Sequence, residues 1–274
     1  MLNLFKSEWQ RLYSKKTTWL CFLLIPVILI ASAKYCLFLN LSVSSTNAKF
    51  TQFYNFPVAS IQEIGRISIN MMLILLIVLS VTEEFTNGSI RLVLIRPIKK
   101  EKVFYAKFLV IMLTIFLILT VYLILGYIFG YIIFPKSSSV TAFYWKRPFN
   151  SHEMFLYTLK YYLILFLTLV AIATLEFFIS IISKSVTISF GINLGIFLFL
   201  SVYPTVLEIF IDSQNPLILK IQWLSVAHIQ FAGIAVMLSP YKALFLYSLI
   251  VLFSYILLFF TINHLIYCKK DNLI

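Results

Sequence analysis

Six long stretches of apolar residues constrain this chain more than any other feature of its sequence. An α-helix needs about 20 mostly apolar residues to cross the hydrocarbon core of a bilayer, because each residue adds only about 1.5 Å. The stretches that meet this requirement are residues 17–39, 60–82, 108–134, 161–182, 186–206 and 243–267. The sequence therefore predicts an all-α integral membrane protein with six transmembrane helices.

Composition excludes the other broad classes of protein. Apolar residues make up 61% of the 274 residues and charged residues only 12%. A soluble domain is about half apolar and about a quarter charged, so no soluble core would accommodate this excess. Glycine and proline number only 7 and 8 against 27 phenylalanines, which excludes collagen-like and disordered chains.

The basic residues predict the orientation of the helices. Lysine and arginine total 22 against 10 acidic residues, a net charge of +12. With both termini in the cytoplasm, the dense basic block at residues 91–107 and the pair Lys269 and Lys270 fall on the inner side, as the positive-inside rule requires. We therefore expect a multi-pass membrane protein with both termini inside, and the abundance of Ile, Phe, Lys and Asn, typical of an AT-rich bacterial genome, places it in a bacterial cell membrane. A nucleic-acid partner is not needed to explain the charge, because no basic stripe is interleaved with aromatic residues on a soluble face.

Residues 207–240 are expected to form an external segment rather than a seventh span. Lys220, Gln222, His228 and Gln230 interrupt the apolar character of this segment, and its uninterrupted part is shorter than a span. A seventh span would also place Lys269 and Lys270 outside. We predict short re-entrant or interfacial helices here, before the last span.

Residues 1–16 have the pattern of an amphipathic helix. Leu2, Phe5, Trp9 and Leu12 recur at spacings of three and four residues, with polar residues largely on the other side. Such a helix is expected to lie in the cytoplasmic interface of the membrane. It is either a simple anchor or a helix that also contacts a cytoplasmic partner.

Residues 83–107 form the largest predicted cytoplasmic element between spans. The paired acids Glu83 and Glu84 open it, and a turn signal, a short apolar helix at residues 90–95 and the helix-stopping Pro97 follow. A charge pair between Glu84 and Arg91 would fix the ends of this element. It is either an ordinary loop with positive-inside charges or a rigid element that docks a cytoplasmic partner.

One pattern in this segment resembles the permease subunits of type-2 ABC exporters. The pattern is acid–x–x–x–Gly–(Ser/Thr)–x–Arg–x–x–Leu–x–x–Pro–x–(Lys/Arg), and its residues here are Glu84, Gly88, Ser89, Arg91, Leu94, Pro97, Lys99 and Lys100. The resemblance extends to the amphipathic N-terminus, the six spans and the short helices before the sixth. Length and composition are most similar to permeases for bacitracin resistance, lantibiotic immunity (antimicrobial peptide resistance) and peptide-toxin export.

The resemblance implies a function and partners. Residues 1–274 would form one transmembrane permease domain that pairs with a second permease, identical or different. Residues 83–107, with Glu83 and the pattern residues, would dock into a separate cytoplasmic ATPase. The chain lacks the G-x-x-x-x-G-K-[ST] phosphate loop, so ATP and Mg²⁺ are expected on that partner, and neither enzymatic activity nor a bound cofactor is expected here. The cargo would be amphipathic or hydrophobic.

Glu176 is the one acid placed deep inside a predicted span. A carboxylate near mid-membrane costs about 2.5–3.5 kcal/mol on insertion scales, so it needs a partner or a wet cavity. Pairing with Lys184 is the structural interpretation, and a place on the translocation path is the functional one. No metal site is predicted, because His152 and His228 lack Cys or Asp at ligand spacing and His264 is interpreted as an interfacial histidine.

Two other functions remain open from the sequence. A non-transporting membrane scaffold or sensor would share the predicted topology. A secondary transporter would need ion ligands near the middle of the membrane, where only Glu176 is available.

Overall fold

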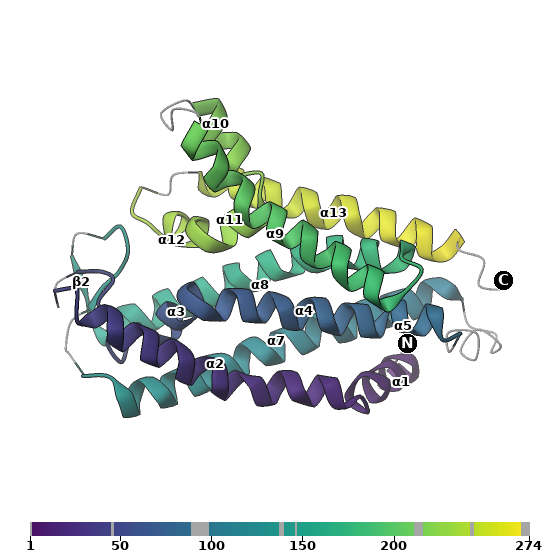
Figure 1. The fold of residues 1–274 in the computed structure, drawn as a ribbon, viewed down its shortest axis with the longest axis horizontal. Coiled ribbons are helices and arrows are strands. Elements are labelled where there is room, and N and C mark those ends of the chain that lie inside the picture. Colours follow the sequence, from purple (N-terminus) through teal and green to yellow (C-terminus); the bar gives the residue numbers. More distant parts are fainter. Residues whose placement is uncertain are drawn as a thin grey trace.

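The computed structural model of the protein describes residues 2–44, 47–88, 99–136, 140–145, 147–210, 216–241 and 244–269. Within these residues, six helices are long and apolar enough to cross a membrane: Lys16–Asn40, Phe56–Thr86, Lys100–Ile133, Ser151–Ile182, Val186–Phe210 and Phe245–Lys269. The predicted fold class, an all-α integral membrane protein with six spans, is confirmed (Figure 1).

The elements of the chain are as follows. The first half contains α1 (Leu2–Tyr13), α2 (Lys16–Asn40), α3 (Phe56–Ser60), the π-helical turn η1 (Ile61–Gly65), α4 (Arg66–Ser80), α5 (Thr82–Thr86) and α7 (Lys100–Ile133). The second half contains the strands β1 (Val140–Thr141) and β2 (Pro148–Phe149), then α8 (Ser151–Ile182), α9 (Val186–Phe210), α10 (Pro216–Gln222), α11 (Val226–His228), η2 (Ile229–Gly233), α12 (Ile234–Met237) and α13 (Phe245–Lys269). The two strands form a short antiparallel hairpin that pairs Val140 with Phe149.

The second span and α8 form the centre of the bundle. In their most apolar stretches, 61% and 67% of the residues are buried, against 17% in α13. Helices α1, α2 and α3 pack on α7, while α13 packs along α8, and α4 contacts both α8 and α9. The outer helices therefore present broad apolar faces outward, which suits a protein whose solvent is lipid.

Two spans begin more than two helical turns earlier than the apolar stretches suggest, and the second span begins at Phe56 rather than at residue 60. Helix α7 begins at Lys100 rather than at residue 108, and α8 begins at Ser151 rather than at residue 161. The start of α8 is fixed by a capping box in which the Glu153 carboxylate accepts a hydrogen bond of 3.1 Å from the Asn150 N–H. No helix breaker separates Lys100 from the apolar residues that follow, so the helix extends outward through its charged first turns.

The segment before the last span contains short helices, as predicted. Helix α11, η2 and α12 form one short apolar helix, Val226–Met237, which contacts α8, α9 and α13. Val226, Ile229 and Ile234 are fully buried. The Ser225 side chain caps this helix by accepting a hydrogen bond from the His228 N–H. The predicted external residues 211–215 lie outside the described residues.

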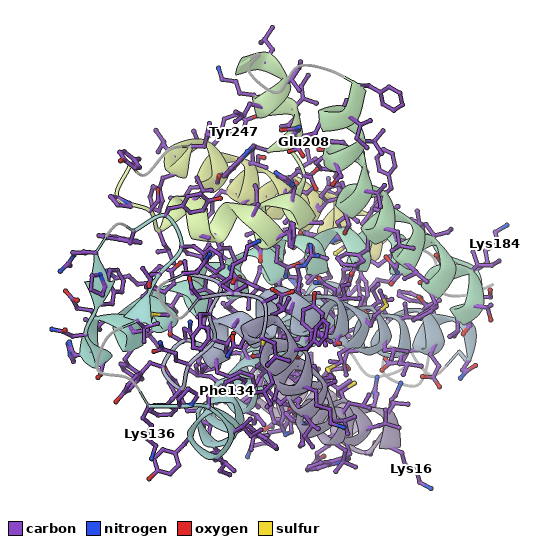
Figure 2. The ribbon with its side chains drawn as sticks, turned by 60° about the vertical axis from the view of Figure 1, so that its left-hand side comes forward. Lys16, Phe134, Lys136, Lys184, Glu208 and Tyr247 are labelled. Carbon is purple, nitrogen blue, oxygen red and sulfur yellow. The ribbon has the colours of Figure 1, made fainter. Side chains whose placement is uncertain are left out.

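The two ends of the bundle carry different elements. Helix α1, α5 and the end of α13 lie at one end, and the β hairpin lies at the other (Figure 1). In Figure 2, Lys16 and Lys184 lie on the side opposite Phe134 and Lys136, as expected when successive spans alternate in direction. We call the end that carries α1, α5, the start of α7 and the end of α13 the α1 end.

Candidate functional site: a buried ion-pair cluster at the α1 end

Lys107 is buried inside the α1 end, with only 1% of its side chain exposed. Its ammonium donates hydrogen bonds to Glu8 Oε2 at 2.7 Å, Glu84 Oε2 at 2.8 Å and the Ser80 carbonyl oxygen at 3.0 Å. An ammonium has three N–H donors, so every donor has an acceptor. The three acceptors come from α1, α5 and α4, which joins these elements to α7.

Arg11 completes the cluster from α1. Its Nη1 lies 2.8 Å from Glu84 Oε2 and 3.3 Å from Glu8 Oε1. Burial opposes the charge of this guanidinium, but the carboxylates of Glu84 and Glu8 outweigh it and raise the pKa of Arg11. The two acids and two bases cancel in charge. Burial of these groups is tolerable because each is paired and hydrogen-bonded.

A second ion pair extends the cluster toward the junction between α1 and α2. Lys15 Nζ lies 2.7 Å from Glu83 Oε2 and also donates to the Leu79 carbonyl oxygen. Both side chains are partly exposed, so this pair stabilises less than the buried one. Together with the Arg11–Glu84 pair, it places both predicted acids, Glu83 and Glu84, in contact with the N-terminal segment.

Helix α1 reaches the cluster because its apolar face lies on α7. Leu12 is buried, and Trp9 stacks on Tyr13 with ring centroids 4.3 Å apart. Glu8 shares this buried face and is only 4% exposed. The sequence analysis did not single out Glu8. The available signal was that Glu8 is the one acid among the basic residues of the N-terminal segment.

The predicted docking residues that the structure describes lie at, or just beyond, the ends of two helices. Glu83 and Glu84 belong to α5, which continues the second span, and Gly88 follows with a positive φ of 66°. Lys99 is the N-cap of α7, and Lys100 is its first residue. The helical ends leave only residues 87–99 of the predicted segment 83–107 between the two spans. The remaining candidates lie outside the described residues: Ser89, Arg91, Leu94 and Pro97.

Glu84 was expected to pair with Arg91. Since Arg91 lies outside the described residues, that pair stays a prediction. Within them, Glu84 is held by Arg11 and Lys107. Lys107 was placed at the mouth of the third span by the sequence, but its burial could not be predicted, because its partners lie on other elements.

Glu176 lies inside α8 and is only 1% exposed. Neither carboxylate oxygen has a hydrogen-bond partner among the described residues. The predicted pairing with Lys184 is not found, since Lys184 is exposed and extends outward from the bundle (Figure 2). Glu176 instead lines a cavity of about 10 Å³ between α8, α9, α11 and α13, together with Asn193 and Tyr255. This volume is close to the least that holds one water molecule.

A seam of hydrogen bonds leads from this cavity to the end of the second span. The Asn193 Nδ2 lies 3.2 Å from the Ser180 hydroxyl oxygen, and Thr82 donates to the Ser180 carbonyl oxygen at 2.9 Å. The Ser189 hydroxyl contacts both Thr82 and Ser180. Because such polar contacts join helices in a membrane, the seam fastens α5, α8 and α9 to one another.

Comparison with known proteins identifies the family. The uncharacterized membrane protein YdbK of Bacillus subtilis (strain 168) is 39% identical over 62 residues, which is 23% of this chain. The match spans 24% of that relative's length, so the similarity concerns about a quarter of each protein. A family model described as "Protein of unknown function (DUF2705)" matches residues 19–273, nearly the whole chain. The chain therefore belongs to the DUF2705 family.

Proposed function

We propose that this protein is the transmembrane subunit of an ATP-driven ABC exporter in a bacterial cell membrane, with its α1 end in the cytoplasm. It moves an amphipathic or hydrophobic cargo outward, such as a peptide toxin, an antimicrobial peptide or a lipid-like compound. A second permease subunit completes the path. A separate cytoplasmic ATPase binds ATP and Mg²⁺ and docks on residues 83–107.

The observation that carries this proposal is the buried cluster of Glu8, Arg11, Glu84 and Lys107. It lies where the second and third spans leave the bundle on either side of residues 87–99. A partner that pushes on those residues displaces α5 and the start of α7. Because both are ion-paired to α1, the displacement reaches three elements together instead of being absorbed by a loose loop.

The backbone after the second span supports the same proposal. Gly88 has a φ of 66°, a left-handed conformation that glycine adopts without the steric cost of a Cβ. The chain therefore turns sharply just past α5. A docking element needs one defined backbone conformation at this position, whereas a plain connecting loop tolerates many conformations.

The experiment is co-expression with an ABC ATPase encoded beside this protein's gene, followed by reconstitution in liposomes. We expect a stable complex whose ATPase rate rises with the permease present. Gly88→Val should abolish most of the stimulation, because valine is strained at this φ. Gly191→Val is the matched control, since a Cβ at Gly191 meets nothing within 4 Å.

Two results would contradict the exporter proposal. One is the absence of a complex with any such ATPase when the permease is correctly inserted. The other is a complex in which Gly88→Val and Gly191→Val stimulate hydrolysis equally. A single-cysteine crosslink from residue 95 to the ATPase, with none from Lys136 at the opposite end, provides an independent measure of docking.

Glu176 favours a second candidate, a proton-coupled secondary transporter. A buried carboxyl without a hydrogen-bond partner is a feature of intramembrane proton sites. In that case, vesicles without ATP should accumulate cargo when a pH gradient is imposed, and Glu176→Gln should abolish the accumulation. Transport that requires ATP and ignores the gradient would favour the exporter. If neither ATP-driven nor gradient-driven transport is detected, the scaffold or sensor hypothesis is favoured.

A further inference from the structure

Three side chains with metal-binding atoms meet at the α1 end, outside the ion-pair cluster. They are Glu101 in the first turn of α7, and His264 and Cys268 near the end of α13. Their ligand atoms all lie within 4.8 Å of one another. The sequence did not suggest this group, because Glu101 is far from the other two along the chain and His264 was interpreted as interfacial.

The backbone holds the three side chains in position. His264 and Cys268 are four residues apart on one helix, so they lie on the same face. Glu101 is brought to that face because α7 packs against α13. The Phe104 ring lies 5.8 Å from His264 and 5.5 Å from Tyr267, centroid to centroid.

The spacing of the three ligand atoms, within 4.8 Å of one another, approaches the spacing in a tetrahedral zinc site. Zinc–ligand distances of about 2.0–2.3 Å separate neighbouring ligand atoms by about 3.3–3.6 Å in a tetrahedron. The observed group must therefore contract by about 1 Å. Glu101 is exposed and His264 and Cys268 are partly exposed, so all three side chains have room to rotate toward a common ion.

The ligand types favour zinc over the hard cations Mg²⁺ and Ca²⁺. A thiolate and an imidazole suit zinc, whereas Mg²⁺ and Ca²⁺ prefer oxygen ligands alone. A Cys268 thiolate, a Glu101 carboxylate and a neutral His264 also balance the two positive charges of the ion. Three protein ligands leave the fourth position to water.

We propose that Glu101, His264 and Cys268 bind one Zn²⁺ ion that ties the start of α7 to the end of α13. The ion would lock the two helices at the point where residues 87–99 lead into α7. The proposal uses no feature of the exporter hypothesis, so either can fail without the other.

The test uses the full-length protein in detergent, stripped of metal and titrated with Zn²⁺ against a chromophoric chelator. We expect one Zn²⁺ per chain. Cys268→Ser and His264→Gln should each weaken binding by roughly 100-fold or more, because loss of an outer-shell partner alone costs about 10–100-fold. Cys36→Ser is the matched control, since this buried thiol belongs to the core and its removal should leave affinity unchanged.

A second readout separates loss of metal from loss of fold. Co²⁺ in place of Zn²⁺ should show the absorption bands of a tetrahedral, thiolate-ligated ion in the wild type and not in Cys268→Ser. Zn²⁺ should also slow alkylation of Cys268 by a maleimide, and His264→Gln should remove that protection while keeping the elution profile of the wild type. Absence of stoichiometric binding, or equal alkylation with and without Zn²⁺, would overturn the site.

Discussion

Lys107 shows how a charged side chain is accommodated at the edge of a membrane span. Its three donor hydrogens meet Glu8, Glu84 and the Ser80 carbonyl oxygen, and its side chain is 1% exposed. An ion pair of this kind adds little net stability over apolar packing, but removing one partner is costly. The cluster therefore adds little to the stability of the fold, but the substitution of a single member is costly.

We predict that Lys107→Met lowers the free energy of unfolding by about 3 kcal/mol, because two buried carboxylates, Glu8 and Glu84, would be left with only the partly exposed Arg11 as a cation. Chemical unfolding in detergent micelles measures the change. Lys102→Met is the control, since Lys102 lies on the same helix and is exposed. Equal stability of the two variants would show that the cluster is not buried in the folded protein.

Glu176 presents the opposite situation, a buried acid whose oxygens have no hydrogen-bond partner within the described part of the chain. We predict that Glu176→Leu is at least as stable as the wild type, because it removes a desolvated carboxyl. Lys184→Ala should change the melting temperature little, because Lys184 is exposed. Thermal unfolding of the purified protein tests both variants. A matched loss of stability in the two would instead support a Glu176–Lys184 pair.

At the scale of elements, α1 is an amphipathic helix whose buried face carries charge as well as apolar residues. Leu12 and the stacked Trp9 and Tyr13 provide the apolar contacts, and Glu8 and Arg11 provide the ionic ones. A helix held only by lipid would slide or rotate in the interface. The ion pairs with Glu84 and Lys107 give α1 one rotational position relative to α5 and α7.

We expect Glu8→Lys to detach α1 from the bundle, since the new cation would face Lys107 and Arg11. Hydrogen exchange of the α1 amides should accelerate by at least tenfold, corresponding to a loss of about 1.4 kcal/mol of local stability. Gln10→Lys, on the exposed side of the same helix, should exchange like the wild type. Unchanged protection in Glu8→Lys would argue that lipid alone holds α1.

At the scale of the whole molecule, six spans bring α1 and the end of α13 to the α1 end (Figure 1). The cluster, the described ends of the segment 83–107 and the three metal-binding side chains all lie there. The β hairpin and the loop after α7 lie at the other end. A division of this kind places the proposed ATPase contact and the proposed zinc site on one side of the membrane.

The proposed orientation predicts a labelling pattern in intact cells. In a background where the three native cysteines are serine, a cysteine at Asn87 should be shielded from an impermeant maleimide added outside. A cysteine at Lys136 should react, and one at Lys269 should be shielded. Position 138, also expected outside, lies beyond the described residues and serves as a second probe. Opposite reactivity at positions 87 and 269 would contradict six crossings.

The sequence by itself determined the fold class, because a span requires a long apolar stretch and that requirement is local. It also determined that Val226–Met237 is too short to be a span, and it drew attention to Glu83, Glu84 and Glu176. The surroundings of those acids were decided only by the tertiary structure, which pairs Glu83 and Glu84 with the N-terminal segment and leaves Glu176 without a hydrogen-bond partner among the described residues. Lys107 on α7 pairs with Glu84 on α5 and with Glu8 on α1, and His264 on α13 lies close to Glu101 on the neighbouring α7. Periodicity specifies which face of a helix is apolar, but side-chain pairs between helices depend on how the faces pack, which no local pattern encodes.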